Sequence, residues 1–156
     1  PANLARICSA LSTVVQHRAG DRAAVIAVAG QAMVVQGLTG DVDSARRRVT
    51  TELPKAEGSR LDLGLAAAGA MLAASPAASA RQVVELLTDG DLNQTPGDAL
   101  SASVVALRDQ GVALRVVLFD PKADGGLWRR LAGRSDVVGT FEALGPRRLT
   151  GSYRCR

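Results

Sequence analysis

Residues that could carry catalytic chemistry are sparse in this sequence. It contains one histidine, His17, and two cysteines, Cys8 and Cys155. His17 falls in the last turn of a predicted helix and has no serine, cysteine or carboxylate partner at motif spacing. We therefore interpret it as a solvated helix-end residue rather than a general base. The two cysteines have neither metal-ligand spacing nor a disulfide framework, and we interpret Cys8 as core and Cys155 as a free tail thiol.

The loops that bind nucleotides or present nucleophiles are missing as well. The sequence has no G-x-G-x-x-G, no phosphate-binding loop ending in Gly-Lys-Ser/Thr, and no G-x-S-x-G elbow. We therefore expect no enzyme, and a nucleotide-binding or catalytic α/β domain is the weaker alternative.

Composition narrows the class of partner. The chain has 156 residues, a net charge of +4 and 3% aromatic residues. Its arginines are scattered and no aromatics interleave with them, so we expect no nucleic-acid partner. There is no signal peptide and no apolar run of about 18 residues, so we expect no membrane segment in this stretch and a cytoplasmic protein.

Hydrophobic periodicity predicts an alternation of strands and helices. The continuous apolar run AAVIAVA at 23–29 is typical of a strand buried on both faces. The short Gly30-Gln31 turn after it predicts an antiparallel hairpin. The predicted order is helix 3–18, strands 23–29 and 32–38, helices 42–53 and 61–74, strand 82–88, helix 97–110, strand 112–119, helix 127–133 and strand 137–143.

This order predicts an α/β fold. We expect a doubly wound, mostly parallel sheet with one antiparallel edge strand and helices on both faces. One domain over residues 1–143 accounts for all the predicted elements. Residues 144–156 carry four arginines and form a basic C-terminal tail.

The ordered motifs resemble those of the von Willebrand factor A-type (vWA) family, without the first strand of that fold. Residues 20–30 resemble the family's "GDRVAVVSF" approach to its second strand, and residues 58–65 resemble "GTxLxxGL" at the start of a helix. Residues 86–90, LLTDG, match the end of its fourth strand. The resemblance runs from about residue 1 to residue 143.

The resemblance implies a metal-ion-dependent adhesion site, in which hydroxyl and carboxylate oxygens hold a cation such as Mg²⁺. Ser59 matches the threonine of "GT" and Asp89 the aspartate of "TDG". The family's Asp-x-Ser-x-Ser set lies outside the sequence, so we expect no metal on this chain alone and Mg²⁺ only in an intact protein. The structural alternatives are a helix N-cap for Ser59 and a turn-forming role for Asp89.

The resemblance also implies a protein-interaction module, with an AAA+ ATPase or chelatase-like assembly as one class of partner. We expect the interaction surface to be the rim formed by residues 57–60, 89–95 and 120–125, with Arg60, Asp91 and Asn93 as contact residues. The alternative is a metal-free structural scaffold. The family's first strand lies between strands 23–29 and 83–88, so we expect another segment to supply it. Direct pairing of those two strands would contradict this expectation.

Overall fold

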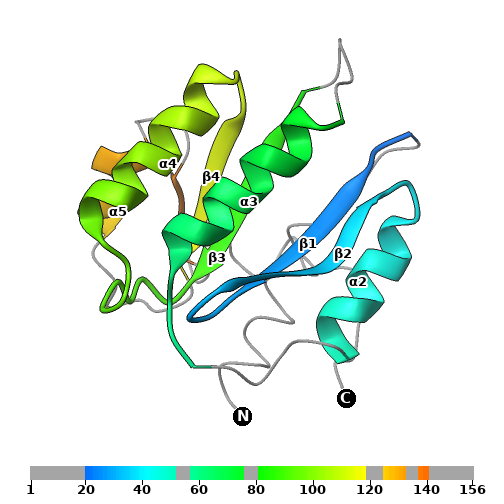
Figure 1. Cartoon of the computed structure of the whole chain (residues 1–156), viewed down its shortest axis with the longest axis horizontal. Coiled ribbons are helices and arrows are strands. Elements are labelled where there is room, and N and C mark those ends of the chain that lie inside the picture. Colours follow the sequence, from blue (N-terminus) through cyan, green and yellow to red (C-terminus); the bar gives the residue numbers. More distant parts are fainter. Residues whose placement is uncertain (1–19, 52–56, 76–80, 119–124, 133–136, 141–156) are drawn as a thin grey trace.

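The computed structural model describes residues 20–51, 57–75, 81–118, 125–132 and 137–140, and these form strands and helices in the predicted order (Figure 1). The predicted helix 3–18, with His17 and Cys8, and the tail with Cys155 lie outside them. The described elements are β1 (Ala23–Val28), β2 (Ala32–Thr39), α2 (Val42–Thr51), α3 (Leu61–Ala73), β3 (Val83–Thr88), α4 (Gly97–Asp109), β4 (Ala113–Leu118), α5 (Gly125–Ala132) and β5 (Val137–Thr140).

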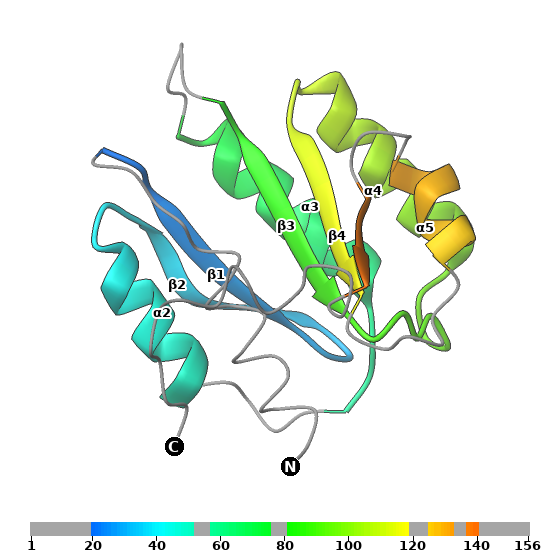
Figure 2. The same ribbon diagram turned by 180° about the vertical axis from the view of Figure 1, so that it is seen from behind.

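The described strands form two separate sheets. β1 pairs with β2 in an antiparallel hairpin, as the short turn predicted, and β3, β4 and β5 form a parallel sheet in that order. We expected a single sheet. β1 and β3 lie side by side with the same direction but are not hydrogen-bonded to each other (Figure 2). Direct pairing, which would have contradicted the expectation of a further strand, is therefore absent from the described residues.

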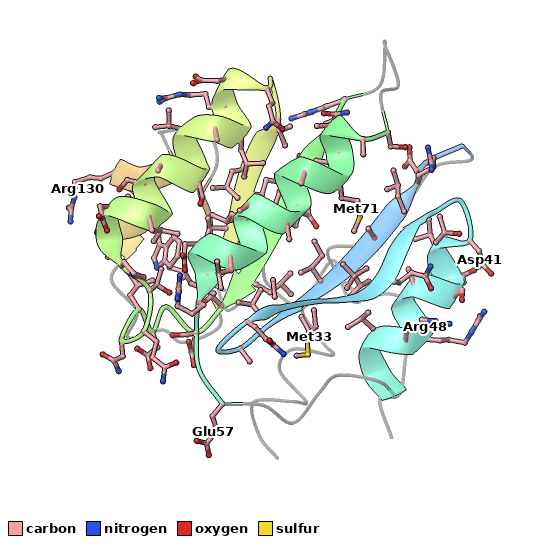
Figure 3. All side chains as sticks on the ribbon, in the orientation of Figure 1. Met33, Asp41, Arg48, Glu57, Met71 and Arg130 are labelled. Carbon is pink, nitrogen blue, oxygen red and sulfur yellow. The ribbon has the colours of Figure 1, made fainter. Side chains whose placement is uncertain are left out.

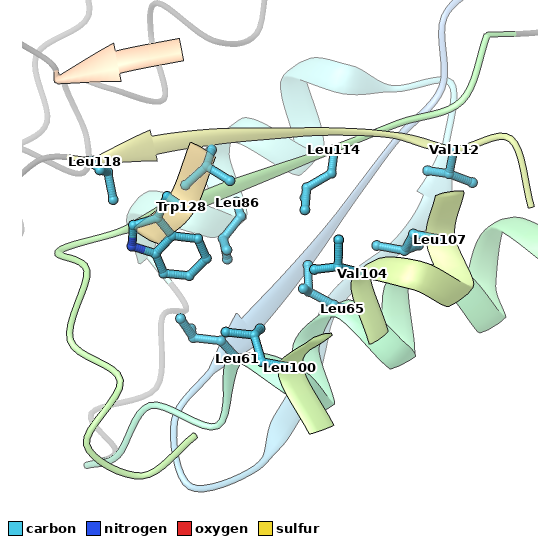
Figure 4. Packing of buried hydrophobic residues seen from close by; sticks show 11 residues of the cluster. Leu61, Leu65, Leu86, Leu100, Val104, Leu107, Val112, Leu114, Leu118 and Trp128 are labelled. Atoms are coloured by element: carbon cyan, nitrogen blue, oxygen red, sulfur yellow. The ribbon is translucent and has the colours of Figure 1, made fainter. Parts of the chain in front are cut away.

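The core lies between the parallel sheet and helices α3 and α4. Alternate residues of β4, namely Leu114, Val116 and Leu118, point into it, as the period of two in a strand requires. Trp128 of α5 closes the core beside Leu118 (Figure 4). This tryptophan is 1% exposed, and its large apolar ring anchors α5 to the strand ends.

Helix α3 packs closely against β1 and α4 because its glycines leave room for their side chains. Gly64 lies against Val28 of β1, where an added Cβ would collide with a methyl group. Further along the helix, Gly69 lies against Leu107 of α4, with 3.1 Å between the position of an added Cβ and Cδ2. The glycines thus let α3 approach β1 and α4 closely, while Leu61 and Leu65 of the same helix join Leu86 of the parallel sheet in the core.

Candidate functional site

Three connections meet at the carboxyl ends of β1 and β3. They are the Gly30-Gln31 turn after β1, the Glu57–Arg60 loop before α3, and the Asp89–Pro96 loop between β3 and α4 (Figure 1). Ligands of open α/β sheets bind outside the carboxyl ends of the strands. Of the predicted rim, residues 57–60 and 89–95 lie here, whereas residues 120–124 fall outside the described part.

The Glu57–Arg60 loop is bound to the β1–β2 turn through the backbone. The N–H of Gly30 donates to the carbonyl of Glu57 at 2.9 Å, and the N–H of Arg60 donates to the carbonyl of Ala29 at 2.8 Å. Gly58 lies between them with a φ of +109°. A Cβ there would lie 2.6 Å from the backbone nitrogen of Gly30, so only glycine fits without a shift.

Side chains that bond to nearby backbone groups build the Asp89–Pro96 loop. The hydroxyl of Thr88 accepts from the N–H of Gly90 at 3.0 Å, and a carboxylate oxygen of Asp89 accepts from the N–H of Asp91 at 3.1 Å. Asp91 in turn accepts from the N–H of Asn93 at 2.9 Å. These turns leave Asp89, Asp91 and Asn93 exposed to solvent.

The Asp89 geometry confirms the interpretation of this residue as turn-forming. The interpretation of Ser59 as a helix N-cap is wrong. The N-cap of α3 is Arg60, and no side chain caps it. The backbone explains why the cap is Arg60, because the carbonyl of Arg60, and not that of Ser59, accepts the N–H groups of Leu63 and Gly64 in the first turn. Ser59 is partly buried at the rim.

Arg60 forms a two-pronged ion pair with Asp62, which the sequence did not predict. Its Nε and Nη2 donate to the two carboxylate oxygens at 2.8 and 2.7 Å, and Asp62 is 4% exposed. The hydrogen bonds from Arg60 lower the pKa of Asp62 below its ordinary value, and they raise the pKa of Arg60. The predicted contact residue Arg60 thus brings a charge to the rim that Asp62 already balances.

The described residues do not by themselves fit a bound metal ion. Mg²⁺ requires about six oxygen ligands in near-octahedral geometry, some of which are usually waters. The candidate ligands Ser59 and Asp89 supply two side chains. Within the described ranges, no three histidine, cysteine, aspartate or glutamate side chains are grouped closely enough to hold a metal.

Thr95 is a buried site residue that the sequence analysis did not single out. Its hydroxyl accepts the N–H of Leu61 at 3.1 Å and donates to the carbonyl of Ser59, and the residue is 8% exposed. A threonine before Pro96-Gly97 is ordinary in a turn, so nothing local points to a contact with residues more than thirty positions earlier.

Comparison with known proteins identifies the family. Residues 1–91 match the family model described as von Willebrand factor type A domain. The chain belongs to this family. No curated protein sequence matches it. None of the described helices of this vWA domain is long and apolar enough to cross a membrane.

Solved structures share the vWA fold with this chain. A von Willebrand factor type A protein from Catenulispora acidiphila is 21% identical with a TM-score of 0.69, and the matched region covers 95% of this chain and 36% of that protein. Proximal thread matrix protein 1 from the mussel byssus was solved with a zinc-occupied adhesion-site motif. It is 20% identical with a TM-score of 0.67, and the matched region covers 89% of this chain and 36% of that protein.

A third similar structure is an aerotolerance-related membrane protein from Bacteroides fragilis NCTC 9343. It is 19% identical with a TM-score of 0.62, and 74% of this chain covers 56% of that protein. This vWA domain therefore spans about half or less of the three proteins. At these identities the likeness shows the fold alone.

Proposed function

We propose that this vWA domain is a protein-interaction module whose contact surface is the rim of residues 57–60 and 89–95. Domains of this family are commonly interaction modules rather than enzymes. The observation that carries the proposal is that the Glu57–Arg60 loop before α3 and the Asp89–Pro96 loop after β3 converge into one hydrogen-bonded edge. Their outward side chains are polar and exposed, as in a surface that a rigid scaffold presents to a partner.

The charge on the rim favours a basic or cation-bearing contact on the partner. Glu57, Asp89 and Asp91 are exposed, and Glu57 projects away from the body of the molecule (Figure 3). Arg60 adds no compensating free charge because Asp62 balances it. The rim is therefore acidic in a chain whose net charge is +4. An AAA+ ATPase assembly is the class of partner that the family resemblance favours.

The test uses a partner identified by crosslinking and then purified. Calorimetry compares the wild-type domain with Asp89→Asn and Asn93→Ala. The matched control is Asp109→Asn, which removes an exposed carboxylate at the opposite end of α4. We expect the rim variants to weaken binding and the control to leave it unchanged. Equal affinity for all four proteins would exclude the rim.

Metal dependence separates two forms of this proposal. A metal-free interaction scaffold is favoured by the short ligand set of Ser59 and Asp89. A Mg²⁺-dependent binder is favoured by family membership and by the zinc-occupied motif of the mussel protein. Partner affinity measured in EDTA and again with excess Mg²⁺ decides between them. Unchanged affinity supports the scaffold, and a gain with Mg²⁺ that Asp89→Asn abolishes supports the metal site.

A further inference from the structure

Thr95 differs from the rest of its loop in where its side chain bonds. The side chains of Thr88, Asp89 and Asp91 bond to backbone groups two residues ahead, so they shape the loop locally. The hydroxyl of Thr95 instead bonds to backbone groups of Ser59 and Leu61, 36 and 34 residues away in the sequence. It therefore links two loops rather than closing one.

The hydroxyl satisfies backbone groups in a place from which water is largely excluded. Thr95 is 8% exposed, and the N–H of Leu61 is shared between the Thr95 hydroxyl at 3.1 Å and the carbonyl of Ser59 at 3.0 Å. The backbone N–H of Thr95 donates to the carbonyl of Leu92 at 2.9 Å, which fixes the hydroxyl relative to the loop. A buried hydroxyl with both its donor and its acceptor used is strongly oriented.

The same short loop is bound on its other side to the β1–β2 turn. Glu57 and Arg60 exchange backbone hydrogen bonds with Gly30 and Ala29, as described above. β1 and β3 do not pair with each other in the described residues. The Glu57–Leu61 segment therefore connects the carboxyl end of β1 with the loop that follows β3. From the β3 side, the side-chain oxygen of Gln94 lies beside Gly58, and the hydroxyl of Thr95 makes the hydrogen bonds to that segment.

We propose that Thr95 is the positioning residue of the rim. It holds the Glu57–Arg60 loop and the Asp89–Pro96 loop in one fixed arrangement, so that they present a single surface to a partner. This role rests on the proposed function of the rim. Thr95 is buried and acts through the two loops, so the partner contacts the loops rather than the threonine itself.

The test follows amide signals of the ¹⁵N-labelled full chain and needs no partner. It compares wild type, Thr95→Ser, which keeps the hydroxyl, and Thr95→Val, which has a similar shape without it. We expect the Leu61 amide to exchange about tenfold faster in Thr95→Val, because losing one buried hydrogen bond has an effect of that order. Thr95→Ser should exchange at the wild-type rate, and the Val116 amide in β4 should report an intact core in all three proteins.

A second readout measures the link itself. Asp89→Asn is introduced into the wild-type, Thr95→Ser and Thr95→Val proteins, and the change in chemical shift that it causes is measured at the amides of Gly58 and Arg60. We expect a change at these amides in the wild-type and Thr95→Ser proteins and no change in Thr95→Val. Equal shifts in all backgrounds, or an unprotected Leu61 amide in the wild-type chain, would overturn the proposal. The protection of the Leu61 amide is measured on the wild-type chain, so this measurement can refute the proposal even if Thr95→Val fails to fold.

Binding then separates this inference from the function on which it rests. With the purified partner, Thr95→Val should lose affinity and Thr95→Ser should regain it. If amide coupling is intact but affinity ignores both Asp89→Asn and Thr95→Val, the proposed function fails and the link stands. If affinity depends on Asp89 while Thr95→Val leaves coupling and affinity unchanged, the positioning role fails and the function stands.

Discussion

Gly58 offers a direct test of the rim geometry, because its backbone angle and its surroundings both exclude a side chain. Its φ is +109°, and an added Cβ would lie 2.6 Å from the nitrogen and 2.9 Å from the Cα of Gly30. Gly20 has a similar φ of +93°, but nothing lies within 4 Å of its added Cβ. Alanine at Gly20 therefore measures the backbone cost alone, and alanine at Gly58 adds the steric cost.

The magnitudes follow from these two terms. Holding a non-glycine residue in the left-handed region costs roughly 1–2 kcal/mol, which is the loss of stability expected for Gly20→Ala. Overpacking a filled site costs about 1–3 kcal/mol more, so Gly58→Ala should lose about 2–5 kcal/mol. A domain of ordinary stability has only about 5–15 kcal/mol in total, so this loss is large.

Equilibrium urea denaturation of the two variants and wild type gives the free energies of unfolding. Gly97→Ala is a further control, because no atom lies within 4 Å of its added Cβ and its φ is not positive. We expect it to be neutral or slightly stabilising, since alanine favours the helix. Equal losses for Gly58→Ala and Gly20→Ala would refute the tight packing of the Glu57–Arg60 loop against the β1–β2 turn.

Three further predictions concern the core and the sheet. Gly64→Ala should destabilise the domain by about 1–3 kcal/mol through its contact with Val28, and Val28→Ala should make the same substitution cheaper in a double-mutant cycle of unfolding free energies. Trp128→Ala should cost about 3–5 kcal/mol, measured by circular dichroism because the variant lacks the chain's one tryptophan; a loss under about 1 kcal/mol would contradict its burial. Burial raises the pKa of Glu85 above its ordinary value of 4.5, although the hydrogen bond from Arg115 opposes the shift. The favourable contribution of Glu85 to the stability of the fold is therefore present below pH 4.5 and is lost as pH rises through the raised pKa. The free energy of unfolding of Glu85→Gln should therefore rise relative to that of wild type as the pH rises across that window. If the two free energies follow parallel curves against pH, the pKa of Glu85 is not raised.

The sequence predicted the helices and strands well because the apolar patterns are strong. Strand 23–29 is observed as β1 (Ala23–Val28), and helix 61–74 as α3 (Leu61–Ala73). Each has a run of small or branched apolar residues bounded by glycine or polar residues, so local preference and tertiary burial agree. The ends differ by a residue or two, as at the C-terminal end of α3, which is Ala73 instead of the predicted residue 74.

The candidate site was predicted only in outline. Ser59 and Asp89 were placed on loops at one edge of the molecule through motif resemblance, and the structure puts both loops there. The Arg60–Asp62 pair and the Thr95 link were missed for different reasons. Residues two apart do not face each other on a helix, so the pair depends on Arg60 lying just outside it. The Thr95 contact joins distant segments, and no periodicity in a single sequence encodes such a contact.

The separation of the two sheets also has a consequence for handling the protein. Within the described residues, β1 and β3 each leave one long edge without a strand partner, and both have mostly apolar sequences. Such edges are templates for pairing with other molecules. We expect a further strand to pair with these edges, and a second copy of the domain is one molecule that can supply it at high concentration. A titration of any partner should be run over a range of domain concentrations, with the molecular mass of the species measured at each. Self-association of the domain is then not mistaken for binding of the partner.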